Sequence, residues 1–204
     1  MGCTARRDGR ITGLVLAGGR GTRMGCVDKG LQPFGVVPMA LHVMRRLQPQ
    51  VDGIMINANQ NLAAYEAFGA PVWPDAMAGY PGPLAGLQTG LMRCPTPYLV
   101  TVPCDSPFLP CDLVKRLLAG LQAHQADLAL AVTGAGPTLQ PHPVFCLAKT
   151  TLLPHLTAYL NAGGRKVDAW FVTCKVARVH FADERSFRNI NTLEELRRFS
   201  ADPA

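Results

Sequence analysis

Apolar runs alternate with segments of mixed polarity along almost the whole chain. The apolar runs predict strands over residues 11–16, 53–58, 71–73, 98–102, 127–132, 143–147 and 174–181. The segments between them predict helices near 38–48, 61–68, 83–93, 111–124, 149–162, 164–171 and 192–199. The last helix begins with Thr192-Leu-Glu-Glu195, which has the form of a capping box.

This alternation predicts the fold class. Mostly continuous apolar strands are typical of a sheet that is covered on both faces. Strands joined through helices form right-handed crossovers, so we expect a three-layer α/β/α sandwich with a Rossmann-like, mostly parallel sheet. The chain of 204 residues is long enough to bury a substantial core in a single domain, 1–204. The Gly/Pro-rich stretches 79–86 and 134–143 are interpreted as active-site loops.

The first apolar run ends in a glycine-rich segment that also carries cations. Residues 16–25 read Leu-Ala-Gly-Gly-Arg-Gly-Thr-Arg-Met-Gly, and Asp28-Lys29-Gly30 follow. Glycine lets backbone N–H groups approach phosphate, and successive N–H groups form a concave anion site. Arg20, Arg23 and Lys29 add charges that suit a polyanion, which favours triphosphate binding. The alternative is an ordinary glycine-rich turn with solvated arginines.

Two common phosphate-binding motifs are excluded by the order of residues in this segment. The chain contains no Gly-Lys dipeptide and therefore no Walker A loop. Counted from Gly19, the third glycine of the dinucleotide fingerprint is replaced by Met24. The sequence therefore favours neither a P-loop NTPase nor a nicotinamide dehydrogenase.

Polar residues follow three predicted strands, at the edge where such sheets bind ligands. Asp105 follows strand 98–102, where a carboxylate beside a triphosphate would hold Mg²⁺; the alternative is a helix cap, for which Asp112 is better placed. Asn57 lies at the end of its strand, where an Asx turn is common. Asp75 carries a carboxylate that could accept both N1–H and N2–H₂ of guanine, a pattern that adenine lacks; contact with the ribose is the alternative.

Three further candidate features lie in the C-terminal third of the chain. Gly163-Gly164-Arg165-Lys166 opens a predicted helix, whose N-terminus with two cations suits a phosphate; a solvated basic turn is the alternative. Asn189-Ile-Asn191-Thr192 precedes the final helix. His142, in a proline-rich stretch, is interpreted as a surface residue without a chemical role.

Residues 16–29 resemble the signature of the nucleotidyltransferases that activate sugars and cofactors with an NTP, and Met-Gly-x-x-Asp-Lys-Gly resembles the molybdenum cofactor guanylyltransferase branch. Pro-Cys-Asp-x-Pro around Asp105, Tyr-Pro-Gly-Pro-Leu-Ala-Gly at 80–86 and Asn-Ile-Asn-Thr at 189–192 resemble further motifs of the same family, in the expected order. The resemblance spans roughly residues 11–199. Cys26 departs from the family pattern, as does Val-Val-Pro at 36–38.

The resemblance implies transfer of GMP from GTP to molybdopterin or its molybdenum-loaded form, with a nucleotide half at about 11–110 and an acceptor half at about 111–199. Mg²⁺ or Mn²⁺ is expected at Asp105, with Asn191 as a candidate second ligand. Arg23, Lys29 and Asp105 are the expected catalytic residues. The expected GTP-binding residues are Leu16, Ala17, Gly18, Gly19, Arg23, Lys29, Asn57, Asp75 and Asp105, and the expected acceptor-binding residues are Arg165, Lys166, Asn189 and Asn191.

Charge and cysteine content agree with this interpretation. The net charge of +6 suits anionic ligands, whereas the five lysines form no cluster interleaved with aromatics, so nucleic acid is not expected as a partner. No apolar run is long enough for a membrane span, and no secretory signal is apparent. Seven cysteines without a C-x-x-C pair favour reduced, mostly buried thiols in a cytoplasmic protein. The family implies transient contacts with cofactor-biosynthesis proteins and molybdoenzyme chaperones.

Two other functions stay open at this level. The first is the same chemistry with another base or acceptor, as in a molybdenum cofactor cytidylyltransferase or a sugar-phosphate nucleotidyltransferase. The second is a non-catalytic nucleotide-binding regulator, which would be expected to lack the metal carboxylate or the lysine. Both Asp105 and Lys29 are present, and this favours an enzyme.

Overall fold

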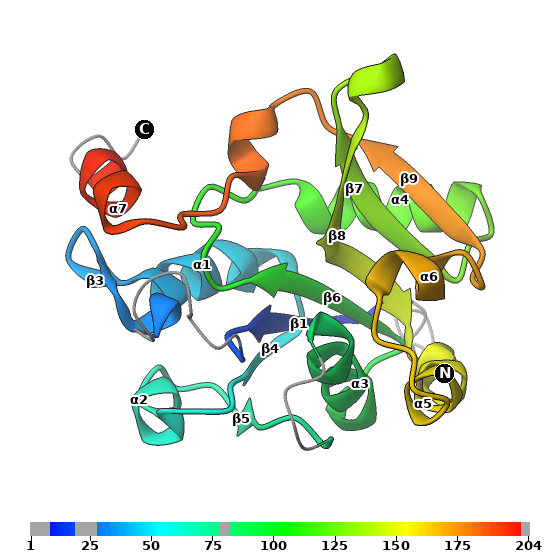
Figure 1. The fold of residues 1–204 in the computed structure, drawn as a ribbon, viewed down its shortest axis with the longest axis horizontal. Coiled ribbons are helices and arrows are strands. Elements are labelled where there is room, and N and C mark those ends of the chain that lie inside the picture. Colours follow the sequence, from blue (N-terminus) through cyan, green and yellow to red (C-terminus); the bar gives the residue numbers. More distant parts are fainter. Residues whose placement is uncertain (1–8, 19–27, 78–81, 201–204) are drawn as a thin grey trace, which may run out of the picture.

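The computed structural model describes residues 9–18, 28–77 and 82–200, and these form a central sheet with helices on both sides (Figure 1). The sheet has seven strands in the order β5-β4-β1-β6-β8-β7-β9. Their bounds are β1 Ile11–Leu16, β4 Gly53–Asn57, β5 Val72–Trp73, β6 Tyr98–Pro103, β7 Leu128–Thr133, β8 Gln140–Lys149 and β9 Val176–His180.

All strands of this sheet except β8 run in one direction. β1 pairs in parallel with β4 and β6, β4 with β5, and β7 with β9, whereas β8 is antiparallel to both β6 and β7. β7 and β8 are joined by a short turn that contains the 3₁₀ segment η4 (Gly136–Thr138), and a connection without a crossover helix forces the next strand to run back. The carboxyl ends of the parallel strands therefore share one edge, which faces β3 (Val37–Pro38), α2 (Leu62–Glu66) and α7 (Leu193–Ser200) in Figure 1.

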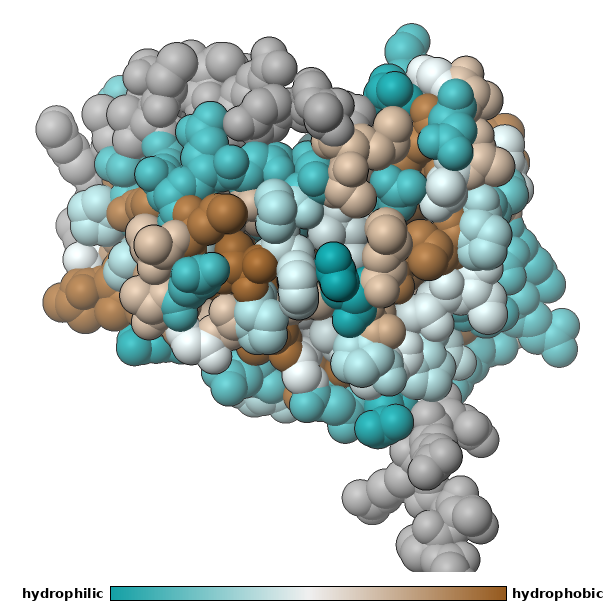
Figure 2. All heavy atoms as spheres, turned by 90° about the horizontal axis from the view of Figure 1, so that it is seen from below, coloured by the Kyte–Doolittle hydropathy of each residue, from teal (hydrophilic) through white to brown (hydrophobic). Residues whose placement is uncertain are grey.

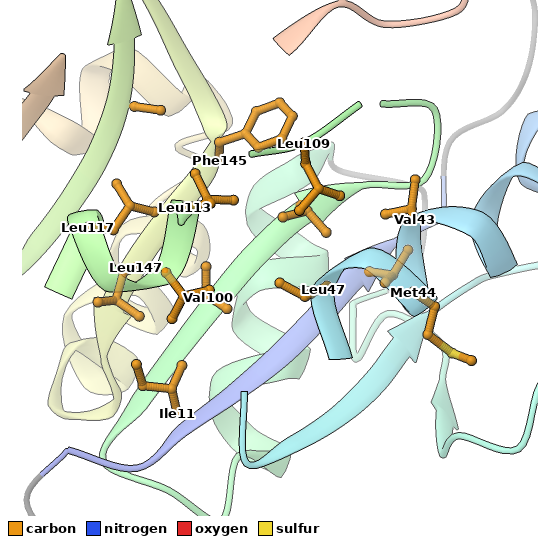
Figure 3. Packing of buried hydrophobic residues seen from close by; sticks show 14 of the residues in the cluster. Ile11, Val43, Met44, Leu47, Val100, Leu109, Leu113, Leu117, Phe145 and Leu147 are labelled. Atoms are coloured by element: carbon orange, nitrogen blue, oxygen red, sulfur yellow. The ribbon is translucent and has the colours of Figure 1, made fainter. Parts of the chain in front are cut away.

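Two apolar clusters cover the two faces of the sheet, as the predicted three-layer sandwich requires. One face packs against α1 (Met39–Leu47) and α4 (Leu113–Ala123), and Figure 3 shows Leu47 and Leu113 from these helices on the same side as Val100 of β6. Leu99, the preceding residue of β6, belongs to the opposite cluster, because successive strand residues point to opposite faces. That cluster includes residues of α3 (Pro83–Arg93), α5 (Leu153–Asn161) and α6 (Val167–Phe171).

Helices α2 and α7 lie at the ligand edge (Figure 1). α2 (Leu62–Glu66) lies between β4 and β5, and α7 (Leu193–Ser200) ends the described chain. The predicted capping box at α7 is confirmed, since Glu195 N donates to Thr192 Oγ1 at 3.1 Å and Thr192 N donates to Glu195 Oε2 at 3.2 Å. The 3₁₀ segments are η2 Lys29–Leu31, η3 Gln48–Gln50, η4 Gly136–Thr138, η5 Thr150–Leu152 and η6 Glu184–Phe187.

Some predicted boundaries are wrong. Residues 140–143, interpreted as part of a loop, belong to β8; the register shifts between Leu130 and Ala131, and prolines are tolerated at such irregular positions. The predicted helix 83–93 is confirmed as α3, so the loop interpretation of 79–86 is wrong for residues 83–86, while residues 79–81 lie outside the described residues. The hairpin of β2 (Pro33–Phe34) and β3 (Val37–Pro38) was not predicted, because strands of two residues leave no periodic pattern.

The described cysteines are free, but they are less uniformly buried than expected. Cys104 and Cys146 are buried, Cys94 and Cys174 are partly buried, and Cys111 is exposed. Burial raises the pKa of Cys146 to about 11, which keeps its thiol protonated and unreactive at neutral pH.

In the part of the chain that the structure describes, no helix is both long and apolar enough to cross a bilayer. Figure 2 shows the lower side of Figure 1, where hydrophobic residues form separate areas between hydrophilic ones.

Close packing between α3 and the sheet gives a first prediction. A Cβ on Gly90 would lie 2.5 Å from Leu14 Cδ2 and 2.8 Å from Leu99 Cδ2, both in fully buried side chains. Gly90→Ala should therefore lower the free energy of unfolding by about 1–2 kcal/mol in urea titrations, despite the better helix propensity of alanine. Gly53→Ala is the control, since a Cβ there meets nothing within 4 Å. Equal stability of the two variants would contradict this account of the packing.

Candidate functional site

A polar cluster forms where β1, β4 and β5 end. Asn57 Nδ2 donates to Asp75 Oδ1 at 2.9 Å and to the Trp73 carbonyl at 3.0 Å. Asn59 Nδ2 donates to Asp75 Oδ2 at 2.9 Å and to the Gly18 carbonyl at 3.3 Å, and Asp75 N donates to Asn59 Oδ1 at 2.8 Å. Both carboxylate oxygens of Asp75 are therefore oriented by side-chain amides.

The structure brings Asn57 and Asp75 together and adds Asn59, which the sequence analysis missed. Side chains two positions apart point to the same face of an extended chain, so the Asn-x-Asn pattern at 57–59 was the available signal. Leu16 pairs with Asn57 in the sheet, and Ala17 N donates to the Asn57 carbonyl at 2.7 Å. The predicted nucleotide-binding residues at 16–18 thus lie beside this cluster, whereas Gly19 and Arg23 lie outside the described residues.

Two glycines make room for the amide side chains. A Cβ on Gly18 would lie 2.8 Å from Asn59 Nδ2, and a Cβ on Gly86 would lie 2.5 Å from Asn57 Oδ1. Gly86 is in the first turns of α3, so this helix approaches the cluster closely because its residue there lacks a side chain.

A second cluster gathers around the ammonium group of Lys29. Lys29 Nζ donates to Asn191 Oδ1 at 2.7 Å and lies 3.4 Å from Asp105 Oδ2. Asp105 follows β6 and is 9% exposed. Burial raises the pKa of the Asp105 carboxyl, and the neighbouring Lys29 opposes that shift. The predicted residues Lys29, Asp105 and Asn191 therefore meet at the sheet edge.

Two hydrogen bonds hold the C-terminal segment against the residues that follow β6. Ile190 N donates to the Asp105 carbonyl at 2.8 Å, and Ser106 Oγ donates to Asn189 Oδ1 at 2.7 Å. Asn189 and Asn191 flank a fully buried Ile190, which anchors the segment. Asn189 itself is exposed, so its amide group is accessible to a ligand.

The donor set around Lys29 fits Mg²⁺ that is shared with phosphates. Mg²⁺ prefers oxygen ligands and usually takes one or two carboxylates together with substrate phosphates and water. Asp105 supplies one carboxylate and Asn191 one amide oxygen, and both groups contact Lys29 Nζ. Within the described residues, no group of three His, Cys, Asp or Glu side chains could hold a metal ion. This part of the protein thus offers a partial coordination site rather than a closed cage.

The structure places Arg165 and Lys166 between α5 and α6, which lie on the side of the molecule away from β3 and α7 in Figure 1. Arg165 Nη1 donates to the Leu160 carbonyl at 2.7 Å and to the Gly164 carbonyl at 2.6 Å, which satisfies acceptors at the end of α5. Both cationic side chains are exposed. Their role in acceptor binding stays a prediction.

The sequence suggested that His142 is a surface side chain in a loop, but the structure places it in β8. Its ring stacks on Phe187 with centroids 4.7 Å apart, and its Nε2 lies 2.8 Å from the Oγ1 of buried Thr133. Burial lowers the pKa of His142. Because Phe187 precedes the segment that carries Asn189 and Asn191, the ring supports that segment from the β7–β8 side.

Comparison with known proteins identifies the family. Residues 13–176 match the model of the MobA-like NTP transferase domain. The chain belongs to this family. A molybdenum cofactor guanylyltransferase of Cupriavidus necator is 57% identical over 188 residues, covering 92% of this chain and 94% of the relative. One from Bordetella petrii is 56% identical over 186 residues, covering 91% and 95%.

Solved structures of low sequence identity share the fold of this NTP transferase. Molybdopterin-guanine dinucleotide biosynthesis protein A of Archaeoglobus fulgidus has a TM-score of 0.72 at 21% identity, covering 93% of this chain and 97% of that one. 4-Diphosphocytidyl-2C-methyl-D-erythritol synthase of Anaerococcus prevotii has a TM-score of 0.74 at 13% identity, covering 95% and 98%. The mostly parallel α/β/α architecture predicted from the sequence is therefore confirmed.

The strand-end cluster gives a second prediction. Asn59→Asp removes the Nδ2 donor to Asp75 and Gly18 and places a second carboxylate beside Asp75. We expect the affinity for a Mg²⁺–nucleoside triphosphate, measured by calorimetry, to fall about tenfold or more. The free energy of a hydrogen bond to a charged group corresponds to about this change in affinity. Asn161→Asp, at the exposed end of α5, is the matched control. Equal affinity of the two variants would rule out this role for Asn59.

Proposed function

We propose that this NTP transferase transfers GMP from GTP to molybdopterin or its molybdenum-loaded form and releases pyrophosphate. The observation that carries the proposal is the meeting of Lys29, Asp105 and Asn191 at the sheet edge, which supplies a cation and oxygen ligands for a metal-bound triphosphate. The name of relatives at 53–57% identity over most of the chain, molybdenum cofactor guanylyltransferase, supports a guanylyl donor and the molybdenum cofactor as the substrates.

In this proposal GTP lies along the carboxyl ends of β1, β4 and β6. Backbone groups of Leu16 to Gly19 line the phosphates, and the oriented Asp75 carboxylate with Asn57 meets the guanosine part. The Asp105 carboxylate holds Mg²⁺, or Mn²⁺ in its place. When bound, the ion would neutralise phosphate charge and orient the triphosphate.

The reaction is a displacement at the α-phosphorus of GTP. An oxygen of the acceptor phosphate forms a bond to the α-phosphorus, and the bond from that phosphorus to the bridging oxygen of pyrophosphate breaks. Lys29 neutralises charge that gathers at the α-phosphate, and Arg23 holds the leaving β- and γ-phosphates. The acceptor phosphate is already anionic, so no general base is needed, and alignment with charge neutralisation accounts for the rate.

The acceptor is assigned to the C-terminal half of a single domain, at about 111–199, opposite a nucleotide half at about 11–110. Asn189 and Asn191 orient the acceptor phosphate, and Arg165 and Lys166 are proposed as further acceptor-binding residues. The product passes to cofactor-biosynthesis proteins or molybdoenzyme chaperones through transient contacts in the cytoplasm.

The carboxylate assignment gives a third prediction. Asp105→Asn should lower kcat for GMP transfer by about two to three orders of magnitude, by analogy with loss of one transition-state charge contact. Asp112→Asn is the control, because that carboxylate forms an exposed ion pair with Arg116 at the start of α4. Release of pyrophosphate with saturating Mg²⁺ and GTP is the measurement. Turnover of Asp105→Asn close to that of the wild type would refute the metal assignment.

The choice of base is tested separately by a nucleotide panel. Calorimetry with GTP, ATP, CTP and UTP, each with Mg²⁺, should detect selective binding of GTP, because the Asp75 carboxylate matches the two donors of guanine. Preference for CTP would instead assign the chain to cytidylyl transfer, and transfer of a nucleotide to a sugar phosphate would change the acceptor. Nucleotide binding without pyrophosphate release would support the regulator hypothesis.

A further inference from the structure

The carboxylate of Asp28 is held by three donors from two parts of the chain. Oδ1 accepts from the Tyr65 hydroxyl at 2.6 Å and from Gly30 N at 3.1 Å, and Oδ2 accepts from Asn61 Nδ2 at 3.0 Å. Asp28 is the N-cap of η2, the 3₁₀ turn whose first residue is Lys29. This carboxylate is therefore directed at its own turn and at helix α2.

The contact between the Tyr65 hydroxyl and Asp28 is tightly packed, because the tyrosine is fully buried. Tyr65 is 0% exposed. Burial raises the pKa of the Tyr65 hydroxyl far above its usual range, so the hydroxyl stays protonated and remains a donor. A Cβ on Gly30 would collide with this hydroxyl, so glycine at that position is required for the close approach of the turn to α2.

Asn61 contributes through an unusual backbone conformation. Its φ of 53° lies in the left-handed region, which asparagine tolerates better than most residues. In this conformation Asn61 precedes α2 and its amide reaches Asp28 Oδ2. The beginning of α2 is thus shaped so that both Asn61 and Tyr65 meet one carboxylate.

We propose that Tyr65 is a positioning residue for Lys29 and that it acts through Asp28. Helix α2 fixes the Asp28 carboxylate, Asp28 fixes the turn, and the turn directs the Lys29 ammonium group toward Asp105 and Asn191. The inference rests on the proposed function, in which Lys29 neutralises charge at the α-phosphate. A lysine side chain is long and flexible, so a fixed backbone at its base limits where its charge can lie.

The test begins with Tyr65→Phe, which removes one hydroxyl and keeps the buried ring. We expect kcat to fall about tenfold or more, since small displacements of a catalytic group have effects up to about 10². The Kd of Mg²⁺–GTP should change by less than about threefold, because the effect falls on the transition state rather than on substrate binding. Tyr98→Phe is the control, as it removes a hydroxyl at the other end of β6. An unchanged kcat in Tyr65→Phe would overturn the proposal.

A second variant separates positioning from stability. Asn61→Gly removes the hydrogen bond to Asp28 Oδ2 and relieves the positive φ, so the free energy of unfolding should not fall by more than the bond contributes. We expect kcat to fall in this variant as well. Full activity of Asn61→Gly together with loss in Tyr65→Phe would assign the Tyr65 effect to packing and overturn the proposal.

A double-mutant cycle tests the route through Lys29. If Tyr65 acts through this lysine, Tyr65→Phe should cause no further loss of kcat in the Lys29→Ala background. An equal fold-change in both backgrounds would show that Tyr65 acts independently and would overturn the proposed route.

A readout without substrate separates this inference from the proposed function. Gly30 N–H donates to Asp28 Oδ1, so its hydrogen exchange reports on the turn. We expect faster exchange at Gly30 in Tyr65→Phe than in Tyr98→Phe, whether or not the wild type transfers GMP. Absence of GMP transfer by the wild type would defeat the proposed function alone, whereas equal exchange in the two variants would defeat the positioning role.

Discussion

Lys29 Nζ lies 2.7 Å from Asn191 Oδ1 and 3.4 Å from Asp105 Oδ2, so one ammonium group joins three segments that are far apart in the chain. The Lys29 and Asp105 side chains are only 18% and 12% exposed, and each charge depends on the other for compensation. Removal of one member of such a pair leaves an uncompensated charge, which is costly. A metal-bound triphosphate brings charges of both signs, and it can therefore replace this contact without leaving either group unpaired.

The C-terminal segment reaches this ion pair through apolar packing that carries no chemistry itself. Ile190 packs in a small separate cluster with Phe34, Met39 and Leu196, which come from the β2–β3 hairpin, α1 and α7. The hairpin thus presents Phe34 to the residue that separates Asn189 from Asn191. Through Phe34, this hairpin of four strand residues supports the segment that carries Asn191, although the charged groups of the site lie elsewhere.

The layers of the fold could be predicted because β1 and β6 are mostly apolar runs, and the polar residues after them indicated the ligand edge. The segment 140–143 was misassigned because its prolines argue against a strand unless the irregular register of β8 is known. Lys29 and Asn191 are 162 positions apart, and no local periodicity encodes their contact. The Tyr65 hydroxyl was likewise inaccessible to sequence reasoning, because a buried tyrosine on a short helix has the same pattern whether or not its hydroxyl has a partner.

Under the proposed function, guanine selection belongs to Asn57, Asn59 and Asp75 as one unit. Both carboxylate oxygens of Asp75 already accept from amide groups at 2.9 Å, yet each oxygen has a second lone pair that can accept from a base. A carboxylate that is fixed before the ligand arrives has less conformational entropy to lose on binding. This fixed arrangement also requires glycine at 18 and 86, because a side chain at either position would displace the amides that hold Asp75 in place. In this proposal, selectivity depends on the residues around the carboxylate as much as on the carboxylate itself.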